Sequence, residues 1–98
     1  MKVKNMVGAS GKSIANQFVI TSLSENELVE YKRFQSYESV IVQISTIKST
    51  NKKVIELDEK YCKYSNTTIK YRNQFLNTTS KDVEQKIKSG EYILTNLN

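Results

Sequence analysis

Apolar and β-branched residues gather in short runs along the first part of the chain. Residues 17–21 are rich in β-branched and aromatic side chains, and a polar connection over 23–27 follows them. From 28 to 34, apolar and charged side chains largely alternate, which is typical of a half-buried strand. We therefore predict two strands that pair as a hairpin.

A second pair of β-rich runs follows. Residues 40–44 match two patterns, because their apolar side chains also recur at the spacing of a helix that would cover 38–47. Their β-branched content and the turn-like stretch 48–52 favour a strand. Together with the run at 54–57, they predict a second hairpin.

The last third of the chain has helical spacing. Residues 65–68 offer several N-cap side chains, and a helix from about 67 to 76 would place five side chains on one face. These five are Thr68, Tyr71, Arg72, Phe75 and Leu76.

A second helix is the best-specified element. Ser80 is its predicted N-cap, Val83 and Ile87 share one face, and Gly90 stands just past its end. The short apolar run 92–94 predicts a closing strand beside one of the hairpins.

These elements predict an α+β fold. We expect a small antiparallel sheet of about four to five strands, two hairpins plus a C-terminal strand, packed with two short C-terminal helices. With 98 residues, the chain has room for one core, so we expect a single domain over 1–98. Residues 1–15 are predicted to be a flexible segment that leads into the first strand.

The composition of the chain indicates the cellular compartment that we expect for the protein. The chain is 38% hydrophobic and 26% charged, and it has no apolar run long enough for a membrane span or a signal peptide. Cys62 is the only cysteine, so no intramolecular disulfide can form. We expect a cytoplasmic protein without a membrane partner.

The net charge of +5 has two explanations. A basic chain often binds nucleic acid or another acidic partner. However, Arg33 and Arg72 are the only arginines among 15 basic residues, Asn and Ile are abundant, and Pro is absent, which is typical of AT-rich coding DNA. Both explanations stay open at this point.

One string, Gly8–Ser13, superficially resembles a phosphate-binding loop. That loop requires a first glycine at the position that Met6 occupies, and it requires a long helix directly after the loop. Here Asn16–Phe18 opens a predicted strand instead. We interpret the string as a polar turn.

Catalytic side chains are scarce. The chain has no histidine, which excludes histidine-based acid–base chemistry and histidine-containing zinc sites. Glu56 and Asp58 could form a carboxylate pair, but a solvated strand end explains them better. Cys62 is best explained as a small core residue. We predict no enzyme activity, no cofactor and no metal.

Basic residues interleave with aromatic ones between Tyr61 and Phe75. This combination occurs in protein interfaces and in single-strand nucleic-acid sites. The alternative is a helix with one core face and one solvated face. The candidate binding surface consists of Tyr64, Thr67, Lys70, Tyr71, Arg72 and Asn73.

Three strings carry a family resemblance: Asn16–Phe18, the segment from Phe34 to Ile41, and the segment from Tyr64 to Leu76. The sequence around Lys86–Gly90 extends it. These strings resemble a family of short phage and prophage proteins of unknown function, for which no catalytic residues are known. The position of Cys62 tends to hold Trp in that family.

The resemblance implies an origin and a mode of action. Small phage proteins often act stoichiometrically, so we expect a non-enzymatic accessory protein, in the cytoplasm of a bacterial host cell, that binds and modulates or inhibits a host protein. A defence complex of the kind that anti-CRISPR proteins target is one example. Direct nucleic-acid binding and a virion or assembly role remain alternatives. The oligomeric state stays open, with self-association through a sheet edge as one option.

Overall fold

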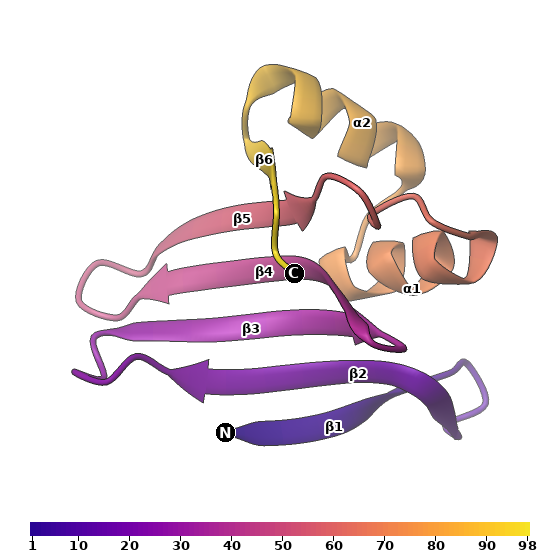
Figure 1. Cartoon of the computed structure of the whole chain (residues 1–98), viewed down its shortest axis with the longest axis horizontal. Coiled ribbons are helices and arrows are strands. Elements are labelled where there is room, and N and C mark those ends of the chain that lie inside the picture. Colours follow the sequence, from indigo (N-terminus) through magenta and orange to yellow (C-terminus); the bar gives the residue numbers. More distant parts are fainter.

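The computed structural model describes residues 1–98 and shows an open six-stranded sheet whose strand order follows the chain (Figure 1). The first five strands form an antiparallel meander, and the sixth lies parallel to the fifth. The strands are β1 (Lys2–Val7), β2 (Ser13–Leu23), β3 (Val29–Ser36), β4 (Ser39–Ile47), β5 (Lys52–Asp58) and β6 (Tyr92–Thr95). The predicted α+β class is confirmed, whereas the sheet is larger than predicted and mixed.

Both predicted hairpins are present, as β2–β3 and β4–β5. Residues 39–47 form a strand, which confirms that their β-branched content outweighs their helical spacing. A turn of only two residues, Tyr37 and Glu38, joins β3 to β4 and so merges the two hairpins into one sheet.

The prediction of a flexible segment over 1–15 is wrong. Lys2–Val7 is β1, paired along β2, and Met6 is buried in the core. The Asn5 side-chain amide also donates to the carbonyl oxygen of Ile14 at 2.9 Å. The polar string from Gly8 is the turn between these strands, with Gly11 at a φ of 81°, and a strand follows it as predicted.

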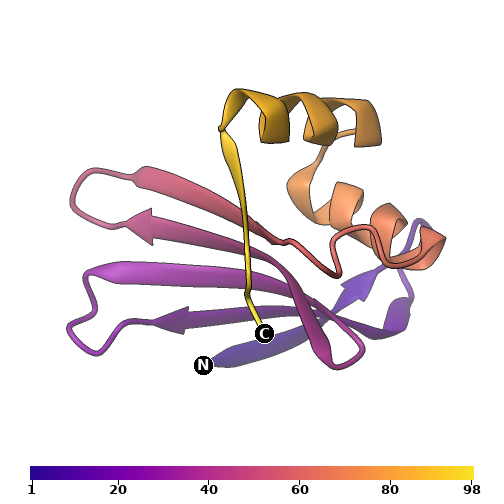
Figure 2. The ribbon, with the colours of Figure 1, turned by 45° about the horizontal axis from the view of Figure 1, so that its top comes forward.

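Two helices follow the meander and cover one face of the sheet near one end (Figure 2). Helix α1 spans Asn66–Leu76, and the Ser65 side chain caps it by accepting from the backbone N–H of Thr68. Helix α2 spans Ser80–Ser89. Its N-cap is Thr79, one residue before the predicted Ser80, and Gly90 ends it as predicted.

The core lies between this face of the sheet and the helices. Phe34, Val42 and Leu57 from neighbouring strands are fully buried, as is Val83 of α2. The Phe34 and Phe75 rings stack with centroids 5.9 Å apart, which fixes α1 against β3.

Asp58 is buried, so the predicted solvated strand end is wrong for this residue. Its carboxylate accepts from the backbone N–H groups of Lys60, Tyr61 and Leu97 and from the Asn98 side chain. The bonds from Leu97 and Asn98 fasten the C-terminal tail, which crosses the end of β5 (Figure 1). Burial raises the pKa of Asp58, but the hydrogen bonds outweigh burial, and its pKa lies below the ordinary value.

Candidate functional site

The predicted binding cluster divides into an exposed part and a buried part. Tyr64 is 74% exposed, and Thr67 and Lys70 are exposed with it. Tyr71 and Arg72 are buried, at 8% and 1% exposure, so they cannot contact a partner at the surface. The physical reason is the helical spacing of α1, which places them on the inward face with Thr68 and Phe75.

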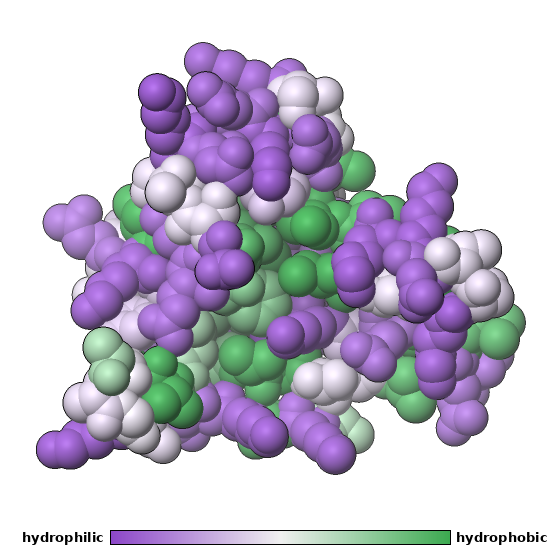
Figure 3. Space-filling view, turned by 180° about the vertical axis from the view of Figure 1, so that it is seen from behind, coloured by the Kyte–Doolittle hydropathy of each residue, from purple (hydrophilic) through white to green (hydrophobic).

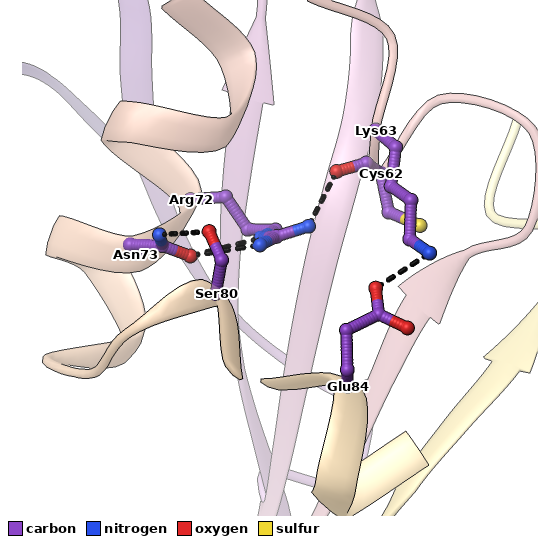
Figure 4. Close-up of polar contacts among 6 residues, drawn as sticks. All are labelled: Cys62, Lys63, Arg72, Asn73, Ser80 and Glu84. Atoms are coloured by element: carbon purple, nitrogen blue, oxygen red, sulfur yellow. Dashed lines mark hydrogen bonds and ion pairs between the residues drawn. The ribbon is translucent and has the colours of Figure 1, made fainter. Parts of the chain in front are cut away.

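Arg72 acts as a buried clamp (Figure 4). Its Nη1 donates to the carbonyl oxygen of Cys62 at 2.9 Å, and its Nε and Nη2 donate to Oδ1 of Asn73 at 3.1 and 2.9 Å. No carboxylate lies within ion-pair distance, and burial lowers the pKa of Arg72. The guanidinium therefore serves as a planar donor that fixes the backbone at Cys62.

The clamp extends to α2 through two contacts. The Asn73 side-chain amide, which is half-buried, donates to Oγ of Ser80 at 2.8 Å. Lys63 forms an ion pair with Glu84, and the hydrogen bond from Lys63 lowers the pKa of that carboxyl. The segment 59–65, which links the sheet to α1, is thereby held by both helices.

This held segment forms one side of a pocket of about 550 Å³. Tyr61 and Tyr64 line the pocket from this segment, and Tyr37 lines it from the β3–β4 turn. The other lining residues are Ser36, Glu38, Ser39, Ile41, Ser65 and Thr68. We call this the tyrosine pocket.

Hydroxyl groups connect β3 with the start of α1 in the lining of the tyrosine pocket. Ser36 Oγ at the end of β3 lies 3.4 Å from Thr68 Oγ1 on α1, and Ser65 Oγ donates to the same Thr68 oxygen at 3.1 Å. These side chains give the pocket hydrogen-bonding groups next to its aromatic walls.

Tyr37 has an unusual backbone. Its φ is 55°, a conformation that costs a bulky residue energy, and yet its side chain is 59% exposed. The backbone N–H of Tyr37 donates to the carbonyl of Asn16 at 2.7 Å, and Gln35 Nε2 donates to the carbonyl of Tyr37 at 2.8 Å. Residues of β2 and β3 thus hold the backbone of this exposed residue in place.

Tyr61 and Tyr64 also contact one another. Their ring centroids are 5.8 Å apart at an interplanar angle of 68°, an edge-to-face contact. The Lys60 ammonium lies 5.2 Å from the Tyr61 ring centroid and does not line the pocket. Tyr64 therefore packs against Tyr61, while most of its surface stays exposed to solvent.

Charged side chains are few around the pocket. Glu38 is its only charged lining residue. Cys62 is buried as predicted, and burial raises the pKa of its thiol more than the charge of Arg72 lowers it. Across the chain, no group of three or more His, Cys, Asp or Glu side chains is placed to hold a metal ion.

Sequence reasoning missed Tyr37 and Glu38 as parts of the site. No local pattern singles them out, because a turn of Tyr and Glu lacks the usual Gly or Asn. They join Tyr64 only because the β3–β4 turn and the start of α1 meet at one end of the sheet.

The structure is a small α+β fold with a pocket that is lined by three tyrosines. The chain belongs to a family of unknown function, DUF8033, whose sequence profile matches residues 1–91. No curated protein and no solved structure matches the chain. No helix of the structure has the length and apolar character that a membrane crossing requires.

Proposed function

We propose that the protein is a non-enzymatic phage or prophage accessory protein that binds a host protein. The observation that carries the proposal is the tyrosine pocket, which is lined by the largely exposed Tyr37 of the β3–β4 turn and Tyr64 of segment 59–65. Tyrosine gives a large contact area at low entropic cost and is common among the residues that dominate binding energy. A segment of the partner enters this pocket and contacts these two rings.

The chemistry of the pocket favours a protein partner over nucleic acid. Its only charged lining residue, Glu38, is acidic and repels phosphate groups. The hydroxyls of Ser39 and Ser65, the lining serines that are not buried, can pair with the backbone of a peptide segment. The basic side chains that give the chain its net charge of +5 lie outside this pocket.

The phage and host parts of the proposal rest on the sequence resemblance. Its three strings lie together around the tyrosine pocket: Asn16 holds Tyr37, and Ser36 lies beside Thr68. A small protein with such a pocket suits stoichiometric blocking of a host protein, such as a defence complex.

A pull-down from phage-infected host cells tests the proposal. The bait is the tagged protein, and the test variant is Tyr37→Gly combined with Tyr64→Ala, because both residues are largely exposed. We expect one dominant host protein in fixed ratio with the wild type, and at least about a hundredfold weaker affinity of that purified protein for the double variant in calorimetry.

The matched control is Leu23→Ala combined with Leu28→Ala. These apolar side chains are exposed at the opposite end of the sheet, at the β2–β3 turn. Recovery that survives the tyrosine double variant would remove the pocket from the interface. Binding to an oligonucleotide that weakens steeply with salt, and that the tyrosine variant abolishes, would favour the nucleic-acid alternative.

A further inference from the structure

A second surface lies along β1, the first edge strand of the sheet. Lys2 and Lys4 of β1 lie in register with Thr21 and Val19 of β2, and Thr21 with Lys32 of β3. These side chains therefore share the sheet face that the helices cover in part.

The three lysines rim a hollow of about 600 Å³. Its floor includes Met6, Val19 and Phe75, and the Lys32 ammonium lies 5.5 Å from the Phe75 ring centroid. No acidic side chain lines this hollow, and none of the three lysines forms an ion pair. Figure 3 shows apolar residues gathered in the middle of this face, with polar side chains bordering them below, where β1 lies.

The edge of β1 is open to another strand. β1 is the first strand of an open sheet, so its outer side has no strand partner. Only its end is covered, where Gln74 of α1 donates to the carbonyl oxygen of Val7. On the opposite face from the lysines, Val3 is 54% exposed.

We propose that the edge of β1 docks an extended segment of a partner protein whose side chains alternate between acidic and apolar. Main-chain hydrogen bonds add that segment to the sheet, as in other cases of β-augmentation. Its acidic side chains lie beside Lys2 and Lys4, and its apolar side chains lie beside Val3, because directly opposite residues share a face. This surface is separate from the tyrosine pocket.

The same lysines disfavour a second copy of the chain as the occupant. An antiparallel pair of β1 strands centred on Val3 sets Lys2 against Lys4, and a pair centred on Lys4 sets that lysine against itself. Lysines on an edge strand commonly prevent such self-pairing. A strand of opposite charge meets no such barrier, so the edge selects its partner by charge.

Nucleic acid uses this surface less well. Phosphates would match the lysines, but Val3 and the free backbone edge would remain unused. The one aromatic ring in the hollow, Phe75, is half-buried and has Lys32 near it, so no base can stack there freely.

Titration of the isotope-labelled protein with designed peptides tests the proposal by NMR. The probe is Ac-Val-Glu-Val-Glu-Val-Glu-Val-amide. The controls are the lysine version of this peptide, a peptide with the same residues grouped by type, and oligo-deoxythymidine. We expect the alternating acidic peptide to shift the amide signals of β1 and to slow their hydrogen exchange by about tenfold or more.

Charge reversal supplies the matched variants. In Lys2→Glu combined with Lys4→Glu, we expect the acidic peptide to bind about tenfold more weakly and the lysine peptide to bind better than it does to the wild type. Lys81→Glu combined with Lys88→Glu changes the net charge equally on exposed positions of α2 and should leave peptide binding within about twofold.

Four results would overturn the proposal. They are no shift of β1 signals with the acidic peptide, equal binding of the grouped peptide, equal weakening by the α2 control variant, and a β1-mediated dimer of the protein alone. Binding of oligo-deoxythymidine to the β1 amides in preference to the acidic peptide would assign the surface to nucleic acid instead.

Discussion

The backbone N–H of Tyr37 donates to the carbonyl oxygen of Asn16 at 2.7 Å, and both residues have positive φ angles, of 55° and 63°. This bond ties the β3–β4 turn to β2 at the mouth of the tyrosine pocket. Asn tolerates the left-handed conformation, whereas Tyr adopts it at a cost. A strained aromatic residue that is also exposed is typical of a site where position matters more than stability.

Replacing Tyr37 should therefore separate stability from binding. In Tyr37→Gly we expect the free energy of unfolding to rise by about 1 kcal/mol, because glycine adopts positive φ without strain. Partner binding should fall at the same time. Urea denaturation measures the first effect and calorimetry with the purified partner the second.

Glu38→Gly is the control for this prediction, because Glu38 shares the turn but has a negative φ. Glycine there should leave stability unchanged or lower it, through the larger freedom of the unfolded chain. A Tyr37→Gly protein that is less stable than the wild type would show that ring contacts outweigh the backbone strain.

Arg72 should matter for stability far more than its charge suggests. In Arg72→Met, the Cys62 carbonyl loses its donor in a buried place, and Asn73 Oδ1 loses two. We expect a loss of about 3 kcal/mol in urea unfolding. Arg33→Met is the comparison, since Arg33 is half-buried and bonds only side chains of the sheet; its loss should be about 1 kcal/mol. Equal losses would contradict the clamp.

Acid should weaken the fold through Asp58. Its pKa in the folded protein lies below the unfolded value of 3.8, so the carboxylate stabilises the fold at pH above 3.8. That contribution is lost as pH falls from 3.8 through the lower, folded pKa. Urea unfolding at several pH values between neutrality and strong acid should show this decline.

Asp58→Asn tests whether Asp58 causes the acid sensitivity. The amide nitrogen of asparagine cannot accept a hydrogen bond, so it leaves unpaired some of the N–H groups that the carboxylate accepts from. We expect a loss of about 2 kcal/mol at neutral pH and a flatter decline in acid. A decline as steep as that of the wild type would place the acid sensitivity in another group.

Several elements could be predicted from the sequence because their signals are local. The alternation over 28–34, the cap signals before α1 and Gly90 after α2 each correspond to observed structure. The helical spacing that groups Arg72 with Tyr71 also indicated the inward face. The candidate binding surface nevertheless included Arg72, because basic residues interleave with aromatic ones between Tyr61 and Phe75.

Other features depend on contacts between distant segments. β1 carries an alternating pattern, but with lysines on its core-side face it resembles a polar leader, and only pairing with β2 makes it a strand. Asp58 is buried only because the C-terminal tail returns to it. The tyrosine pocket likewise joins a turn and a helix start that lie far apart in the chain.

Cys62 offers a direct measure of the clamp on segment 59–65. Its thiol is buried, and burial raises its pKa, so Ellman's reagent at mildly alkaline pH should react with the native protein much more slowly than with the urea-unfolded protein. Since Arg72 holds the Cys62 carbonyl, Arg72→Met should open this segment locally and speed the reaction by more than its loss of global stability accounts for. The wild-type Arg33 bonds only side chains of the sheet. Arg33→Met should therefore speed the thiol reaction only as much as its loss of unfolding free energy predicts. If both variants follow the same relation between labelling rate and unfolding free energy, Cys62 reacts only through global unfolding and Arg72 does not act as a local clamp.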